Sequence, residues 1–156
     1  MNLTELNRAL RAAVGTNRSR AERARDAAEL IRRAARARWV GLYDVTSSEI
    51  SAIAWTGNEA PAHPVFPREQ GLSGIAVASG NTIISNDVAK DPSYLTAFGS
   101  TGSEMIVPIR NNDSLVVGTI DVESERTHAF GIAEREFVEG CVPGVLALWI
   151  QDGWEL

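Results

Sequence analysis

Two apolar runs joined by a polar turn decide the fold: EMIVPIR at residues 104–110 and LVVGTIDVE at residues 115–123. The tetrapeptide NNDS between them consists of residues that favour turns. We therefore expect the two runs to pair as an antiparallel hairpin. Because side chains alternate along a strand, Asp121 and Glu123 share one face, and Glu104 on the neighbouring strand could point into the same space.

The region before this hairpin predicts further short strands. Trp39 to Val45 and Ser51 to Thr56 follow the period of two that is typical of strands, and we expect them to pair across a polar turn. Residues 57–70 contain three prolines and should be largely loop. The segments that follow are predicted as a short helix at Gly71 to Ala78, a strand near Thr82 to Ser85 and a loop rich in small residues at Asp91 to Thr101.

Helices are predicted at both ends of the chain. Apolar residues recur at helical spacing over residues 3–14, and a glycine then offers a stop. The segment SRAE at 19–22 fits a capping box that begins a second helix, whose mostly alanine face needs a closely approaching partner. A closing helix should begin after Phe130 and be kinked or broken by the Pro-Gly pair at 143–144. Helices at both ends of a mostly antiparallel sheet give the fold class α+β.

Composition restricts the class of protein. The chain of 156 residues is 44% apolar and 22% charged, as in ordinary globular domains. Its longest apolar stretch, residues 141–150, is shorter than the ~18 residues that a membrane span needs. The single cysteine excludes an internal disulfide, and no secretory signal is visible, so we expect a cytoplasmic protein. Residues 1–38 hold ten arginines against four acids, which we expect to coat solvent-facing helix surfaces rather than to bind nucleic acid.

Five short motifs together resemble one known family: WVGLY at 39–43, GLSGIA at 71–76, NDV at 86–88, SEMIVP at 103–108 and GTIDVE at 118–123. They resemble the GAF domain over roughly residues 21–150 and, among GAF proteins, the free methionine-(R)-sulfoxide reductases. The resemblance implies a sheet of five to six strands, with the N- and C-terminal helices on one face and short crossover helices on the other. It also implies one domain over residues 1–156, with a helical extension at 1–18, the core at 19–150 and a tail at 151–156.

The chemistry of those reductases depends on cysteine thiolates, and this sequence lacks them. The resemblance places two of the family's cysteines on Ser73 and Ala97, and a third near His63 in the proline-rich loop. A serine hydroxyl ionises far above neutral pH and cannot cycle through a disulfide. Cys141 lies on the closing helix, away from these positions, and we interpret it as a buried, inert residue.

The resemblance implies a ligand pocket from which only the thiols are missing. Trp39 and Tyr43 share a strand face, with Gly41 between them leaving room above the sheet; in the family an aromatic pair here lines the apolar arm of the ligand. The acids at 104, 121 and 123 would hold an ammonium group and the sulfoxide end. The alternatives are that the two aromatic residues belong to the core and that the acids form an exposed strand edge. The implied ligand-binding set is Trp39, Tyr43, Ser73, Ala97, Ser103, Glu104, Asp121 and Glu123.

Other chemistries find little support in the sequence. Two histidines and one cysteine without metal-binding spacing predict no zinc site, and GLSG at 71–74 lacks the lysine and glycine spacing of a phosphate-binding loop. A Ser73–His63 catalytic pair has no orienting third member. The signature of GAF domains that bind cyclic nucleotides is met only by Phe130 with Glu134, and no cysteine is present where a bilin would attach. We therefore expect no metal and no cofactor.

Three functional hypotheses remain. The first is a sensory or regulatory module that binds a small polar or zwitterionic metabolite and signals to a separate partner. The second is an enzyme, either a methionine sulfoxide reductase acting by another route or an activity around Ser73. The third is a GAF module without ligand that forms a homodimer through its terminal helices, which the alanine stripe at 24–35 and the apolar segment Val142 to Trp149 favour. Under all three we expect neither a nucleic acid nor a membrane as partner.

Overall fold

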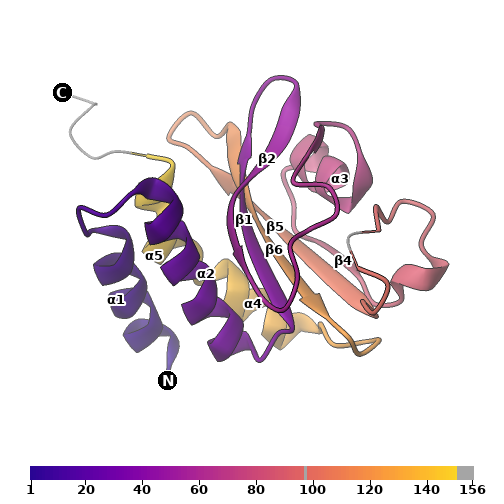
Figure 1. Ribbon diagram of the computed structural model, residues 1–156, viewed down its shortest axis with the longest axis horizontal. Coiled ribbons are helices and arrows are strands. Elements are labelled where there is room, and N and C mark those ends of the chain that lie inside the picture. The colour runs from indigo at the N-terminus through magenta and orange to yellow at the C-terminus, as the bar shows by residue number, and fades with distance from the viewer. Residues whose placement is uncertain (97, 151–156) are drawn as a thin grey trace.

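The computed structural model describes residues 1–96 and 98–150 and contains one six-stranded sheet (Figure 1). The strand order is β3-β2-β1-β6-β5-β4, and every neighbouring pair is antiparallel. The predicted fold class, α+β with a mostly antiparallel sheet, is confirmed. The strands are β1 (Trp39–Val45), β2 (Glu49–Thr56), β3 (Val65–Pro67), β4 (Ile83–Ser85), β5 (Ser103–Arg110) and β6 (Val116–Ser124).

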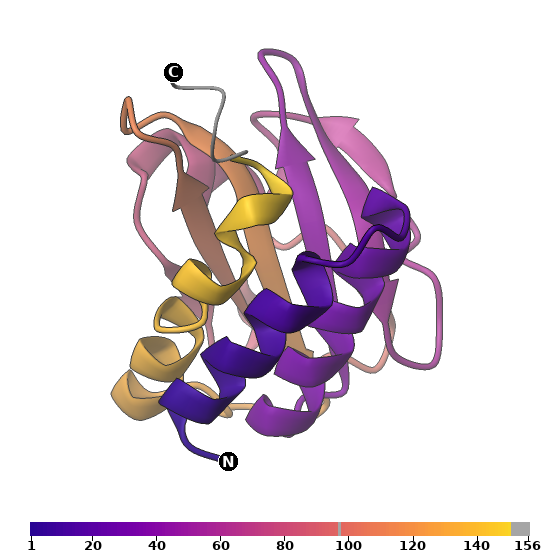
Figure 2. The ribbon, with the colours of Figure 1, turned by 90° about the vertical axis from the view of Figure 1, so that its left-hand side faces the viewer.

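Helices cover one face of the sheet, as Figure 2 shows from their side. They are α1 (Leu3–Val14), α2 (Arg20–Ala35), α4 (Ile132–Glu139), α5 (Val142–Val145) and the 3₁₀ turn η2 (Leu146–Leu148). The opposite face carries the short helix α3 (Gly71–Ser79) and the loop that contains the 3₁₀ turn η1 (Val88–Lys90). Both faces of the sheet are therefore covered.

The alternation of side chains divides the core into two parts. Val40 and Leu42 of β1, with Val122 of β6, belong to the large apolar cluster beneath the helices. Trp39 and Tyr43 belong to a second cluster on the opposite face. Because each face packs against a different cluster, a register slip of one residue would move the side chains of a strand into the wrong layer, and this fixes the pairing.

The first helix is part of the same core. Helix α1 packs on α2 and α5 and buries Leu6, Leu10 and Val14. Ala24, Ala27 and Ala28 on the alanine face of α2 are fully buried within the chain as well, and the segment after Glu139 packs against the same cluster. The apolar features that favoured a homodimer at the level of sequence thus find their partners inside a single chain.

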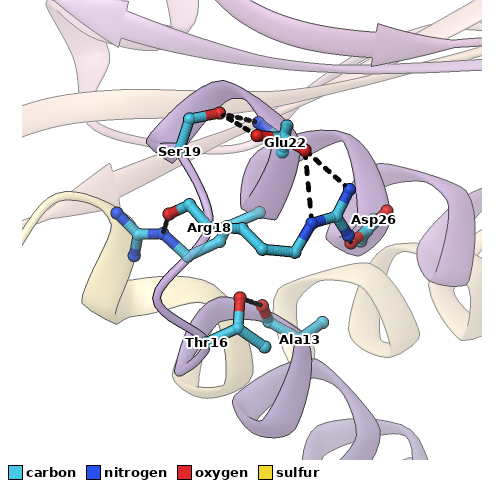
Figure 3. Close-up of polar contacts among 7 residues, drawn as sticks. Ala13, Thr16, Arg18, Ser19, Glu22 and Asp26 are labelled. Carbon is cyan, nitrogen blue, oxygen red and sulfur yellow. Dashed lines mark hydrogen bonds and ion pairs between the residues drawn. The ribbon is translucent and has the colours of Figure 1, made fainter.

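The junction of α1 and α2 forms half of the predicted capping box (Figure 3). The Ser19 hydroxyl accepts a hydrogen bond from the Glu22 backbone N–H at 3.1 Å, as expected of an N-cap. The Glu22 carboxylate accepts from that hydroxyl and from Arg18. Arg18 also pairs with Asp26, and both partners are about half exposed, so these pairs contribute little to stability.

Five of the ten N-terminal arginines form ion pairs with carboxylates of the same chain: Arg18, Arg20, Arg32, Arg33 and Arg38. The Arg20 guanidinium binds both carboxylate oxygens of Asp44 at 2.7 Å and donates to the Leu148 carbonyl at 2.8 Å. This residue joins the start of α2 to the end of β1 and to the C-terminal turn. Much of the basic charge of residues 1–38 is therefore matched locally.

One segment differs from its predicted form and another matches it. A short edge strand, β3, lies within the expected loop 57–70 and pairs with β2 over only three residues, which proline permits at a sheet edge. The closing helix is divided into α4, α5 and η2, as the Pro-Gly pair at 143–144 predicted. No helix among residues 1–96 and 98–150 is long and apolar enough to cross a bilayer.

Gly118 on β6 marks the closest approach of the C-terminal turn to the sheet. The Trp149 indole covers it and donates from Nε1 to the Tyr43 carbonyl at 3.2 Å. A Cβ at position 118 would lie 2.3 Å from that nitrogen and 2.8 Å from the carbonyl oxygen. We therefore expect Gly118→Ala to displace the indole and to lower the free energy of unfolding by roughly 1–3 kcal/mol, measured by urea denaturation.

The matched control for this substitution is Gly99→Ala. A Cβ at position 99 would meet nothing within 4 Å, so this change should leave stability unaltered or raise it slightly. Equal effects of the two substitutions would show that the indole does not need a glycine beneath it.

Candidate functional site

The pairing of β5 with β6 brings three acids together on the face opposite the terminal helices. Glu104 lies directly opposite Glu123, and Asp121 precedes Glu123 by two residues on β6. One carboxylate oxygen from each lies within 4.8 Å of the other two. Glu104 and Asp121 are 6% exposed and Glu123 is 0% exposed, so the acids are not an exposed strand edge. We call these three residues the acid cluster.

A small cavity of about 30 Å³ adjoins the acid cluster. Of the residues expected in the ligand pocket, Tyr43, Ser73, Glu104 and Asp121 line it. The other lining residues come from the proline-rich loop, β3, α3 and the loop after η1: Pro61, His63, Phe66, Gly71, Leu72 and Leu95. Among these, the sequence analysis had named His63, near a cysteine position of the family, and Gly71 and Leu72, which belong to the GLSGIA motif.

Three described residues of the expected pocket do not line this cavity: Trp39, Ser103 and Glu123. Trp39 is 1% exposed and lies among the aromatic residues beside it, with its Nε1 donating to the Glu59 carbonyl. Ser103 alternates onto the helix side of β5, where its hydroxyl donates to the Arg126 carbonyl at 2.6 Å. Ala97 lies outside the described residues. Glu123 is next to the cavity, and its carboxylate accepts hydrogen bonds from the loop that covers the acids.

Aromatic rings fill the space above Gly41. A Cβ at this position would lie 2.4 Å from the Trp39 ring and 2.9 Å from the Tyr43 ring. The two ring centroids are 6.4 Å apart, and the Trp39 ring also makes an edge contact with Phe98 at 5.3 Å. The glycine therefore lets the two rings close over the strand, where the sequence had suggested open room for a ligand.

The loop from Asp91 to Thr101 covers the acid cluster. Tyr94 donates from its hydroxyl to Glu123 Oε1 at 3.2 Å, and Thr101 donates to the same oxygen at 2.8 Å. Phe98 packs between Trp39 and the Arg38 guanidinium, which lies 5.1 Å from its ring centroid. Tyr94, Thr101 and Arg38 were not anticipated, since nothing in a loop sequence tells which strand its hydroxyl groups will meet.

Arg38 holds this loop to two others. Its Nε pairs with Glu125 at 2.8 Å and its Nη2 with Glu59 at 3.2 Å. The Arg38 side chain is only 13% exposed while both carboxylates are largely exposed. One partly buried cation thus meets three loops beside the acid cluster.

Burial and mutual repulsion keep the acid cluster from ionising freely. Burial raises the pKa of Glu104 well above its ordinary value, and the charges of Asp121 and Glu123 raise it further. The pKa of Asp121 is raised first by burial and then by the charge of Glu123. Burial also raises the pKa of Glu123, against the hydrogen bonds from Thr101 and Tyr94, which favour its charged form. The cluster therefore retains protons at pH values at which exposed carboxyl groups have lost them.

Two oxygens of the acid cluster have no hydrogen-bond partner among the described residues: Asp121 Oδ1 and Glu123 Oε2. Buried oxygens without partners are costly, because they have lost water and gained nothing in return. The arrangement is suited to receive a group that brings positive charge and several donors, such as an ammonium group. The spacing of the oxygens would also allow a divalent cation, although the sequence had predicted no metal.

The only thiol of the sequence is remote from this chemistry. Cys141 is fully buried on the helix side of the sheet, and its Sγ donates to the Phe137 carbonyl at 3.3 Å. Burial raises the pKa of this thiol to about 12, so it stays protonated at neutral pH. The structure supports the interpretation of Cys141 as an inert core residue.

Comparison with known sequences decides the family. The profile of the GAF domain matches residues 17–143, most of the chain. The chain belongs to the GAF domain family. The free methionine-R-sulfoxide reductase of Saccharomyces cerevisiae is 32% identical over 104 residues, which are 65% of this chain and 57% of that protein. Protein ZMO0507 of Zymomonas mobilis is 31% identical over 103 residues, covering 66% and 61% of the two chains. The match thus spans about three fifths of the length of these relatives.

Solved structures share the fold of this GAF domain. A free methionine-R-sulfoxide reductase from Neisseria meningitidis, in complex with its substrate, superposes with a TM-score of 0.82 at 21% identity, over 94% of this chain and 87% of that one. The reduced enzyme from Staphylococcus aureus gives 0.79 at 21% identity, over 96% of each chain. At this level of identity the likeness establishes the fold alone.

The raised pKa values of the acid cluster predict how stability depends on pH. Above the ordinary carboxyl pKa of about 4.3, the unfolded chain releases protons that the native cluster keeps. The free energy of unfolding should therefore fall as the pH rises from about 5 towards 8. Glu104→Gln removes one charge from the cluster and should flatten this slope, measured by urea denaturation across that range.

The control for the pH profile is Glu136→Gln on the exposed side of α4, which should keep the slope of the parent protein. Glu29, whose pKa the adjacent Arg32 lowers to about 2, contributes a stability that is lost only as the pH falls below about 4.5. Its effect lies outside the tested range. Parallel profiles for the parent and Glu104→Gln would contradict the assignment of raised pKa values to the cluster.

Proposed function

We propose that this GAF domain is a sensory or regulatory module that binds a small zwitterionic metabolite through the acid cluster, without thiol chemistry. The observation that carries the proposal is that Glu104, Asp121 and Glu123 meet in a buried position with two oxygens lacking partners. An ammonium group supplies the positive charge and the donors that this position lacks. That similar proteins include methionine sulfoxide reductases supports a ligand with an amino-acid backbone.

The size of the cavity indicates how such a ligand would enter. About 30 Å³ holds one water-sized group, so the closed cavity accepts an ammonium group but not a whole amino acid. The remainder of the ligand would displace the loop from Asp91 to Thr101, which donates two hydrogen bonds to Glu123. Tyr43 and Leu72 would then offer apolar surface to the side chain of the ligand.

An enzymatic alternative rests on the residues that share this cavity. Ser73 and His63 both line it, beside two of the acids. A serine nucleophile needs its base within ~2.6–3.2 Å, and no hydrogen bond joins these two side chains in the described part of the chain. A reductase acting without cysteine would need another electron carrier. The binding module is therefore the better-supported function.

Ligand binding should depend on the acids. We expect at least one amino acid, amino-acid sulfoxide or primary amine to raise the melting temperature in a thermal-shift screen. A hydrogen bond to a charged group contributes ~1.5–3 kcal/mol, so Glu104→Gln or Asp121→Asn should weaken binding by roughly ten- to a hundredfold. Both variants should be at least as stable as the parent protein without ligand, because they relieve repulsion between buried carboxylates.

Glu136→Gln serves again as the control and should bind like the parent. If no compound stabilises the protein and both cluster variants are simply destabilised, the binding proposal fails. The hypothesis of a GAF module that has no ligand and serves for dimerisation then replaces it. The screen includes Mg²⁺ and Ca²⁺ alone. Stabilisation by these ions only, lost in Glu104→Gln, would make the cluster a metal site instead.

Reduction of methionine sulfoxide should be absent. With serine at position 73 and its one cysteine buried, the protein should not turn over free methionine-(R)-sulfoxide with dithiothreitol or thioredoxin as reductant. The measurement is methionine formed above a buffer control. Turnover that disappears in Cys141→Ser would contradict the prediction.

We also propose that the module acts in the cytoplasm, as a homodimer, and signals to a separate partner. Removing residues 1–18 would not test the dimer, because Leu6, Leu10 and Val14 are core residues of each chain. Sedimentation of the intact protein at micromolar concentration does test it. A monomer in this measurement would contradict the proposed homodimer.

A further inference from the structure

The helix side of the sheet contains a second cavity, which the proposed function does not use. It has a volume of about 310 Å³ and lies between the last turn of α2, the start of α4 and the ends of β5 and β6. This volume is at the lower end of the ~300–1,000 Å³ range that is typical of small-molecule sites. The sheet separates it from the acid cluster.

The walls of this cavity are apolar because small residues stand where two helices approach each other. Five alanines line it, together with larger apolar groups at its base: Ala34, Ala35, Ala37, Ala129, Ala133, Met105, Phe130, Phe137 and Val138. Phe130 and Val138 are buried in the main core, whereas Ala133 is exposed at the opening. A flat apolar group would bury its surface here without displacing any core side chain.

Two arginines stand at the mouth of the cavity. Arg36 ends α2 in a left-handed conformation (φ 54°), and Arg126 follows β6; both line the cavity and are exposed. Neither forms an ion pair within the described residues. Glu134 also lines the mouth, but its carboxylate accepts from the Gly131 N–H at 2.9 Å as the cap of α4. The mouth therefore offers two guanidinium groups without a carboxylate partner in the described part of the chain.

We propose that this cavity binds a small amphipathic anion, with a flat apolar body and a single carboxylate or sulfonate group. The apolar body would lie against the alanines and phenylalanines of the wall. The anionic group would meet Arg36 and Arg126, whose planar donors suit the two oxygens of a carboxylate. The combination of an apolar interior with unpaired cations at the opening distinguishes this occupant from a neutral or cationic one.

The test uses two fluorescent probes that differ only in charge. 8-Anilinonaphthalene-1-sulfonate carries the anionic group, and N-phenyl-1-naphthylamine is the same ring system without it. The parent protein should bind the sulfonate at least fivefold more tightly than the neutral probe, and 2-naphthoate, a flat aromatic carboxylate, should displace it. Equal affinity for the two probes, or no binding of either, would overturn the proposal.

Variants locate the site. Ala133→Trp should fill the opening and weaken binding of the sulfonate at least tenfold, whereas Ile132→Trp, next to it on α4 but 76% exposed and outside the lining, should not. Arg36→Gln combined with Arg126→Gln should reduce the affinity for the sulfonate to that for the neutral probe. The control Arg8→Gln, at an exposed position of α1, should leave that affinity unchanged. Circular dichroism of each variant verifies that it is folded.

Two further measurements distinguish this cavity from the acid cluster and from a contact surface between two chains. Glu104→Gln should bind the sulfonate like the parent, because the sheet lies between the two sites. If that substitution abolished the signal, the probe would be at the acid cluster and the proposal would fail. If Ala133→Trp instead changed the sedimentation coefficient, the cavity would be a surface between two copies of the chain, which would equally overturn it.

Discussion

The register of β5 on β6 is the constraint on which the rest of this site depends. It places Glu104 opposite Glu123 on the same face as Asp121, while Met105 and Val122 face the helices. A shift of one residue would bring either Glu104 of β5 or the two acids of β6 into the main core, so the register cannot vary. The price is a buried group of acids that repel one another, held under a loop that supplies two hydroxyl donors.

Most of the fold was predictable because its information is local. Alternation gave β1, β2, β5 and β6 within two residues of their observed bounds, and the N-terminal helices followed from spacing and an N-cap serine. The edge strand β3 was missed because three residues held by pairing with β2 carry no period of their own. The partner of the alanine face was not predictable either, since a pattern shows that a face is apolar but not whether the same chain will cover it.

Of the site, the sequence predicted the acids, Tyr43 and Ser73. The positions of the acids and of Tyr43 follow from strand parity, which sequence shows directly. The loop residues Tyr94 and Thr101 depend on how a long irregular segment folds back, and this is set by packing over the whole face. Gly41 shows the same limit: a glycine between two aromatic residues indicates close approach, but whether a ligand or the rings themselves take the space is decided in three dimensions.

Arg38 has a consequence for how this protein could change over time. Its guanidinium contacts Glu59, Glu125 and the Phe98 ring, which belong to three separate loops around the acid cluster. Loops are usually the segments that vary most freely between relatives. Here an insertion or exchange in one loop alters the position of a cation that the other two also need, so mutations in different loops would combine non-additively. Loop sequences transplanted from a relative would therefore be tolerated as a set more readily than singly, and new ligand preferences would arise by coordinated rather than independent substitutions.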